Sequence, residues 1–486
     1  MTDLPMQIGV ALSATAFFVF VLYLAAYRPV IFFGFLFVLF TLVWRTTSTA
    51  FIDLTGPVWS SQTLRYIGPG LATPLHVLAY FITLIPFLML LRPAAIAAWP
   101  DGADDRPAEG STLTLSTATV ICSAFFLTYL FLTLVHRGPI PLFAHIERFV
   151  YTAQYGSAAH RWAMRYANFL AFWWGMMFAA ERLRNRRTDI RFLALLIVLL
   201  AYAFLTGSRF SAFYSTTSFF VIPIAALIAV TTRNHRSRLP FFWIGRAFNL
   251  RDAILLGAVF CVAGTVTTVA IYNNLVSVRG YQNSEISTHF IERVLVQPSE
   301  LGWISYERVF SFGHWHPERV YDFLFQRPLD LHKNTTPQLL MLEAIGEPRT
   351  HEHISGGFQF AGGFPEIFFE LFGPLYAWPF IFGAGYIAAA LTALAIRGTI
   401  EGRYASAFLS LYVLFGFDVM YIGGMLNFVA VRTYWIKIGA LAVALMLEST
   451  LGRAGLPLTP WAIIRIPLFD WLRSKFRSNL SIGSIQ

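Results

Sequence analysis

The residues best suited to chemistry are concentrated in one polar stretch of an otherwise apolar sequence. Residues 273–363 contain six of the 11 histidines: His289, His314, His316, His332, His351 and His353. Glu366 and Glu370 follow where the chain becomes apolar again. A neutral imidazole or a partly buried carboxylate can take a proton from a hydroxyl near pH 7. We therefore expect a catalytic base among Glu366, His351 and His353.

Three arginines are expected at one depth near the same face of a membrane. Arg209 and Arg279 each follow an apolar run, and Arg432 lies about one helical turn inside the last apolar run of the chain. Guanidinium groups match phosphate oxygens in bidentate geometry, so the three together predict an anion site. The alternative for each is a local carboxylate or a lipid headgroup as partner.

Two His-x-His pairs, His314 with His316 and His351 with His353, have a spacing that can share a metal ion on extended backbone. No carboxylate–histidine spacing typical of zinc hydrolases accompanies them. We expect hydrogen-bonded surface histidines and no metal site.

Residues 355–366 are unusually rich in glycine, with four glycines around aromatic side chains. Glycine allows positive φ angles and a close approach of the backbone to a ligand. The segment is either a functional loop or a hinge into a helix whose N-terminus Glu366 favours. Both interpretations remain open.

The elements that position these residues are predicted to be membrane-spanning helices. The chain is 56% hydrophobic and 13% charged, with apolar runs from end to end. We expect an all-α polytopic membrane protein with about 11 spans, and between 9 and 13, near residues 7–27, 30–44, 71–91, 115–135, 164–180, 191–206, 211–230, 252–272, 373–396, 404–420 and 428–448.

The predicted organisation has four parts: N-terminal spans (1–272), a large polar loop (273–363), C-terminal spans (364–450) and an amphipathic cytoplasmic tail (451–486). The net charge of +10 comes from arginines in short connectors, which indicates membrane topology and lipid contact rather than nucleic-acid binding. The positive-inside rule puts the polar loop on the outer face. Within it, helices are expected near 287–312, 317–325 and 337–345.

A family resemblance rests on Leu205-Thr-Gly-Ser-Arg209, Val278-Arg279-Gly280 and Gly362-Gly-Phe-Pro-Glu366 leading into a span. This layout, over roughly residues 190–450, resembles the Wzy-type oligosaccharide repeat unit polymerases of O-antigen and exopolysaccharide synthesis, relatives of the O-antigen ligases. The resemblance implies a multi-pass protein of the bacterial inner membrane with a GT-C-like fold.

The resemblance also implies a glycosyltransferase that polymerises undecaprenyl-pyrophosphate-linked repeat units on the periplasmic face, without a cofactor, nucleotide sugar or metal, and with a possible chain-length regulator as partner. Arg209, Arg279 and Arg432 would hold the pyrophosphate, and Glu366, His351 or His353 would take the acceptor proton. Tryptophan and tyrosine side chains of the loop would stack on sugar rings. An O-antigen ligase, a lipid-linked oligosaccharide flippase and a non-catalytic export scaffold are the alternatives.

Overall fold

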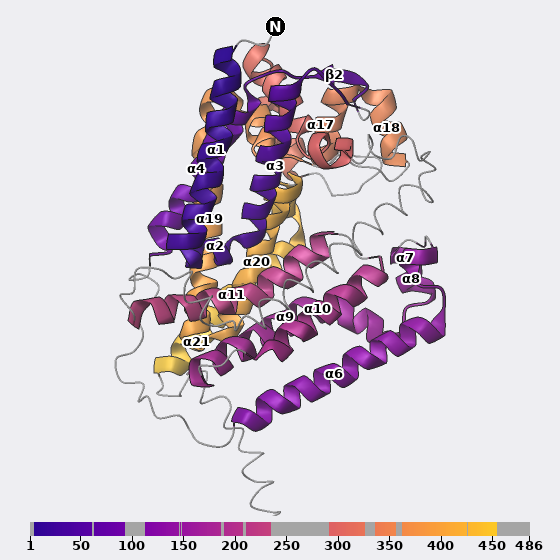
Figure 1. The fold of residues 1–486 in the computed structure, drawn as a ribbon, viewed down its shortest axis with the longest axis vertical. Coiled ribbons are helices and arrows are strands. Elements are labelled where there is room, and N and C mark those ends of the chain that lie inside the picture. The colour runs from indigo at the N-terminus through magenta and orange to yellow at the C-terminus, as the bar shows by residue number, and fades with distance from the viewer. Residues whose placement is uncertain are drawn as a thin grey trace, which may run out of the picture. The chain divides into compact units, whose positions relative to one another are not determined.

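The computed structural model describes residues 4–60, 63–92, 112–144, 146, 148–185, 189–207, 210–234, 291–325, 336–355, 362–424 and 426–453. The chain divides into two compact units, each assembled from separate stretches of sequence. Unit 1 comprises residues 1–96, 231–394 and 409–440, and unit 2 comprises residues 97–230, 395–408 and 441–486. Figure 1 shows the described residues as ribbon, and helices dominate it.

Six helices in the described part of the chain are long and apolar enough to span a membrane: Leu4–Tyr27, Leu36–Thr55, Ala72–Leu90, Ser116–Ala144, Glu366–Ile400 and Tyr404–Gly423. Two shorter apolar helices lie at Ile190–Leu205 and Ser215–Val230. The prediction of an all-α membrane protein is thereby confirmed. The count of 11 spans stays a prediction, and the expected span at 252–272 lies outside the described residues.

Unit 1 begins with three packed helices, α1 (Leu4–Tyr27), α3 (Leu36–Thr55) and α4 (Ala72–Leu90), shown in indigo and purple in Figure 1. A short helix α2 (Pro29–Gly34) precedes α3, and a hairpin of β1 (Val58–Ser60) and β2 (Arg65–Ile67) follows it. The span predicted near 30–44 corresponds to α2 and α3 together, but α3 continues well past its predicted end. Arg45 therefore lies inside the helix, where it has a partner within the protein.

The polar loop folds into short helices: η2 (Glu292–Val296), α15 (Glu300–Tyr306), η3 (Glu307–Ser311), η4 (Pro317–Arg319), α16 (Val320–Phe325), α17 (Thr336–Ile345) and α18 (Glu347–Ser355). The three expected helical regions are confirmed. Helix α18 was not among the predicted helices, because Gly346 and Pro348 are residue types that usually end a helix. Pro348 is instead the second residue of α18, where its missing N–H costs nothing.

Two of these loop helices, η2 and α15, pack directly along α3. The indole nitrogen of Trp44 donates to the Val294 carbonyl at 2.8 Å, and that of Trp303 donates to Asp53 at 3.0 Å. Trp303 also belongs to a buried apolar cluster with Ile52, Ile67, Ala72, Val296 and Ile304. In the described residues the loop is therefore part of the core of unit 1.

Helix α19 (Glu366–Ile400) consists of two helices joined at a sharp bend. Gly373 at the bend has φ 72° and ψ −179°, outside the helical region. Phe369 before the bend packs on Trp378 after it, with ring centroids 5.2 Å apart. Phe372 stacks on Phe380 at 3.8 Å. The short helix at 366–372 therefore folds beside the first turns of the span that follows.

The entry into α19 lies beside the middle of the neighbouring helices. Phe364 packs against Tyr80, about two turns into α4, with ring centroids 6.2 Å apart. Its backbone carbonyl accepts a hydrogen bond from Arg45, which is near the middle of α3. The chain thus re-enters the helix bundle before α19 begins.

The turn after α20 (Tyr404–Gly423) reaches the same place. Gly424 lies so close to Gly363 that a Cβ on either would overlap the backbone of the other. Tyr421 packs against Phe364, with centroids 4.6 Å apart, and against Phe35 at the start of α3, at 5.5 Å. The chain then forms η5 (Asn427–Ala430) and α21 (Arg432–Arg453). Irregular backbone is tolerated at this depth because it is buried in protein.

Unit 2 is built from α6 (Thr112–Arg137), α7 (Pro141–Ala144), α8 (Arg148–Gln154), α9 (Ala158–Asn185), α10 (Ile190–Leu205) and α11 (Phe210–Asn234). Helix α9 has no side chain at Gly175, which lets the backbone of α11 at Phe220 come into contact. Phe408, from the first turns of α20, packs on Phe172 of α9 and Phe219 of α11.

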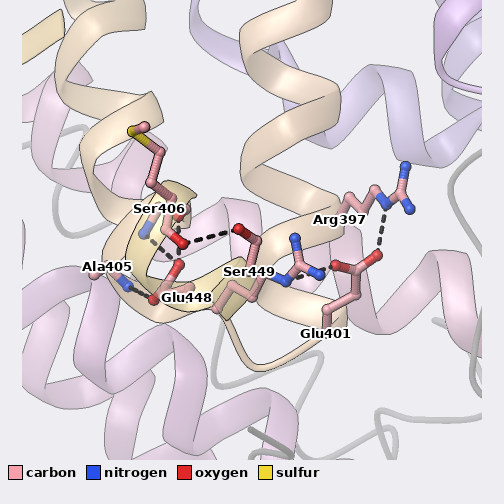
Figure 2. Close-up of polar contacts among 8 residues, drawn as sticks. Arg397, Glu401, Ala405, Ser406, Glu448 and Ser449 are labelled. Atoms are coloured by element: carbon pink, nitrogen blue, oxygen red, sulfur yellow. Dashed lines mark hydrogen bonds and ion pairs between the residues drawn. The ribbon is translucent and has the colours of Figure 1, made fainter. Parts of the chain in front are cut away.

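A carboxylate from α21 fixes the start of α20 in unit 2. Glu448 accepts hydrogen bonds from the backbone N–H groups of Ala405 and Ser406, at 3.0 and 3.2 Å, and from the Ser406 hydroxyl (Figure 2). Anions are favoured at helix N-termini, so this cap joins the two helices. Nearby, Glu401 binds both Arg397 and Arg403, at 2.5 and 3.1 Å.

The contact between Gly363 and Gly424 generates a prediction about stability. Gly424→Ala should destabilise the protein by more than about 2 kcal/mol, because its φ of +65° already disfavours a side chain and the Cβ would overlap Gly363. The control is the adjacent Gly423→Ala, whose Cβ would meet no atom within 4 Å, and its effect should stay below about 1 kcal/mol. Thermal unfolding in detergent measures both. Equal effects would contradict the close contact.

Candidate functional site

A buried ion pair lies where the re-entrant segment meets α3. Arg45 Nη2 pairs with Glu366, and Arg45 Nη1 donates to the Phe364 carbonyl. Arg45 is 2% exposed and Glu366 is 0% exposed. A single charge at this position would be costly, but the two together carry no net charge, and the carbonyl satisfies a further donor. The pair therefore fixes the start of α19 against the middle of α3.

Helix α15 covers this ion pair. A Cβ on Gly302 would lie 2.5 Å from Glu366 Oε1 and 2.7 Å from His76 Cε1. Glu366 and the His76 imidazole therefore flank the same point, and only glycine leaves room for both. Gly362 lies on another side, where a Cβ would be 3.4 Å from Arg45 Nη2.

Two tyrosines extend the site deeper into unit 1. The rings of Tyr80 and Tyr421 both pack on Phe364, and Tyr80 also lies 6.3 Å from the His76 ring. We call Arg45, His76, Tyr80, Glu366 and Tyr421 the Arg45 cluster. Within the described residues, hydrogen-bond partners are lacking for several of its buried atoms: Arg45 Nε, His76 Nδ1, Tyr80 Oη, Glu366 Oε2 and Tyr421 Oη. The cluster therefore has the capacity to hydrogen-bond a polar guest.

A second carboxylate on α19 attaches the loop to the span. Glu370 lies 3.8 Å from Arg308, and its backbone carbonyl accepts from the His316 N–H at 2.8 Å. The Trp315 indole lies where a Cβ on Gly373 would be 3.0 Å away. These contacts hold residues 308–316 at the bend of α19, so the loop and the Arg45 cluster are connected through one short helix.

Glu300 is a buried carboxyl group outside the spans, at the start of α15. The Ser60 hydroxyl donates to it at 2.8 Å, and its side chain is closed to solvent. Burial raises the pKa of Glu300 to about 8, the Ser60 hydrogen bond lowers it, and the nearby Glu292 raises it further. The carboxyl group is thus protonated at neutral pH and joins α15 to the β1–β2 hairpin.

The structure describes the side chains of three of the six predicted site residues. Glu366 lies in the Arg45 cluster, His351 is exposed on α18, and Arg432 is exposed as the first residue of α21. His353 also belongs to α18, but its side chain lies outside the described residues, as do Arg209 and Arg279. Where the chain is described, the partner of Glu366 is Arg45 and none of the predicted arginines.

Two other expectations can be compared with the structure. His351 and His353 lie in a helix, whereas a shared metal would require extended backbone there. No group of three or more His, Cys, Asp or Glu side chains suited to a metal occurs in the described residues.

Of the loop aromatics expected to stack on sugars, Trp303 is 5% exposed and belongs to the core, while Trp315 and Tyr321 are exposed.

Sequence reasoning missed four members of the Arg45 cluster. Arg45 interrupts an apolar run, and an ionisable residue inside a membrane span is itself a signal of a functional or paired site. His76 lies four residues before Tyr80, so the two share one face of a helix. Tyr421 has no such signal, because a single tyrosine near a helix end is common.

Comparison with known proteins gives one partial match. The model of a family of unknown function (DUF6418) matches residues 331–436, less than a quarter of the chain. The matched region includes Gly363, Glu366, Tyr421 and Gly424, and it leaves out Arg45 and His76. No curated protein and no solved structure matches.

The buried pair predicts strong coupling between its two members. Arg45→Ala or Glu366→Ala alone should destabilise the protein by about 3–5 kcal/mol, because each leaves an uncompensated buried charge. The double variant Arg45→Met/Glu366→Gln should recover much of this loss. The exposed pair Arg397–Glu401 is the control, and Arg397→Ala should cost less than about 1 kcal/mol. A double variant that is less stable in thermal unfolding than either single variant would contradict the pairing.

Glu300 predicts a pH dependence of stability. Its pKa is higher in the folded protein than in the unfolded chain, so the folded state retains a proton that the unfolded state has lost. Its contribution is therefore favourable below the unfolded value of 4.5 and declines as the pH rises towards about 8. Glu300→Gln should raise the melting temperature relative to wild type at pH 8 more than at pH 5. A difference independent of pH would show that Glu300 does not titrate in this range.

Proposed function

We propose that this protein is a membrane glycosyltransferase that polymerises oligosaccharide repeat units linked to undecaprenyl pyrophosphate, with Glu366 as the base. The observation that carries the proposal is the position of Glu366. It lies in a buried polar cluster, next to Arg45 and His76, at the junction between the polar loop and a long span.

The proposed chemistry is a transfer between two lipid-linked glycans. The acceptor hydroxyl oxygen attacks the anomeric carbon of the donor, and the bond from that carbon to the pyrophosphate oxygen breaks. The pyrophosphate leaves with the bonding electrons, and the hydroxyl proton passes to Glu366. The ion pair with Arg45 holds the Glu366 carboxylate in its buried position. Arg209, Arg279 and Arg432 retain their predicted role as ligands of the pyrophosphate.

Access to Glu366 requires movement of α15. Gly302 of this helix closes over the carboxylate, which is 0% exposed. In this proposal α15 moves aside to admit the acceptor and excludes water from the cluster when it returns.

A transporter of lipid-linked oligosaccharide is the second candidate, and one observation favours it. Two connectors re-enter the bundle and meet at Gly363 and Gly424, and broken helices that meet inside a membrane protein commonly form transport sites. An O-antigen ligase would share the proposed chemistry but use a different acceptor.

Deletion of the protein separates these functions. Loss of a polymerase should leave single repeat units on the outer leaflet or capped on lipid A, whereas loss of a transporter should trap them on the inner leaflet. Loss of a ligase should leave long chains on the carrier lipid. The measurement is gel analysis of extracted lipid-linked glycan with and without periplasmic enzymatic digestion. Unchanged glycan would remove all three functions.

The role of Glu366 is tested by a variant that keeps its charge. Glu366→Asp retains the partner of Arg45 but withdraws the carboxylate by one methylene, so chain growth should fall by at least about 100-fold at normal protein levels. Glu401→Asp, a carboxylate paired with exposed Arg397, is the control and should leave chain length unchanged. If Glu366→Asp gives wild-type chain length and His351→Ala abolishes chain growth, the base is His351 of α18 and not Glu366.

A further inference from the structure

We propose that the Arg45 cluster binds a neutral hydroxyl-bearing sugar through the phenols of Tyr80 and Tyr421, and that it is not the pyrophosphate site. The identification of this sugar as the acceptor rests on the proposed function. The binding chemistry itself is argued from the cluster alone.

The charge of the cluster disfavours an anion. The positive charge of Arg45 is already matched by Glu366, and the remaining members that line the site are an imidazole and two phenols. A phosphate would bring at least one unmatched negative charge into a buried site next to the Glu366 carboxylate, which is costly at low dielectric. A neutral guest brings no such cost.

The hydrogen-bonding groups of the cluster fit hydroxyls. Tyr80 and Tyr421 are both 0% exposed, and neither phenol has a partner among the described residues. His76, at 1% exposure, adds Nδ1, and Glu366 adds Oε2. A phenol both donates and accepts, as a sugar hydroxyl does, and the Glu366 oxygen accepts only. The set therefore offers both donors and acceptors to the hydroxyls of a sugar.

The direct test measures binding with the full-length protein reconstituted in vesicles of phosphatidylethanolamine and phosphatidylglycerol. The probes are neutral methyl glycosides of common hexoses, with inorganic pyrophosphate as the charged comparator. At least one glycoside should raise the melting temperature at millimolar concentration. Tyr80→Phe and Tyr421→Phe should each raise its half-saturating concentration about three- to tenfold, the effect of losing one hydrogen bond.

Tyr202→Phe is the matched control. Tyr202 belongs to unit 2 and is 0% exposed, and its hydroxyl hydrogen-bonds His160 at 2.9 Å. The substitution therefore removes a buried phenol oxygen, as in the two cluster variants, but from a residue outside the Arg45 cluster. It should leave glycoside binding unchanged. The proposal is overturned if no glycoside raises the melting temperature, or if all three variants weaken binding equally. Pyrophosphate stabilisation that Tyr80→Phe and Tyr421→Phe both weaken would also overturn it.

A polymerisation assay separates this inference from the proposed function. With lipid-linked repeat units as substrate, the two cluster variants should raise the KM for the acceptor and leave the KM for the donor unchanged. If wild type polymerises but the variants alter only the donor KM, the inference fails and the proposed function stands. If wild type does not polymerise but binds glycosides through Tyr80 and Tyr421, the proposed function fails and the sugar site stands.

Discussion

The rest of unit 1 depends on the buried ion pair between Arg45 and Glu366. Burying either charge alone would cost several kcal/mol, so each residue requires the other. Because Arg45 is near the middle of α3, the pair brings the start of α19 to that depth. The Phe364 carbonyl completes the arrangement by accepting from the second nitrogen of the guanidinium group. One interaction thereby determines where a long polar loop ends.

The close backbone contacts follow from this depth. A segment that enters the bundle must pass between helices, so positions with no space for a side chain are occupied by glycine. Gly363 meets Gly424 backbone to backbone, and Gly302 of α15 faces Glu366 and His76. The polar loop therefore contributes to the interior of unit 1, where its aromatic residue Trp303 packs with Ile52 and Ala72. A loop that lay on the surface would need none of these contacts.

The same arrangement joins stability and the proposed function at one residue. Glu366 is the partner of Arg45, and its second oxygen, like the phenol oxygens of Tyr80 and Tyr421, has no hydrogen-bond partner among the described residues. The Glu366 carboxylate is buried and fixed by its ion pair, which is the basis for proposing it as a base. Helix α15 covers it without a side chain at Gly302, because a Cβ there would overlap Glu366 and His76.

The amino-acid sequence by itself determined the helical membrane class, the polar loop with three of its helical regions, and Glu366 as a residue of interest, because these depend on local composition and spacing. It did not reveal that α3 continues through Arg45, since a cation ends a span unless a distant residue neutralises it. It also did not bring His76, Tyr80 and Tyr421 to Glu366, because these residues come from separate helices far apart in the chain. Only the tertiary structure decided these points, since an ion pair between residues 45 and 366 is a long-range contact with no local signature.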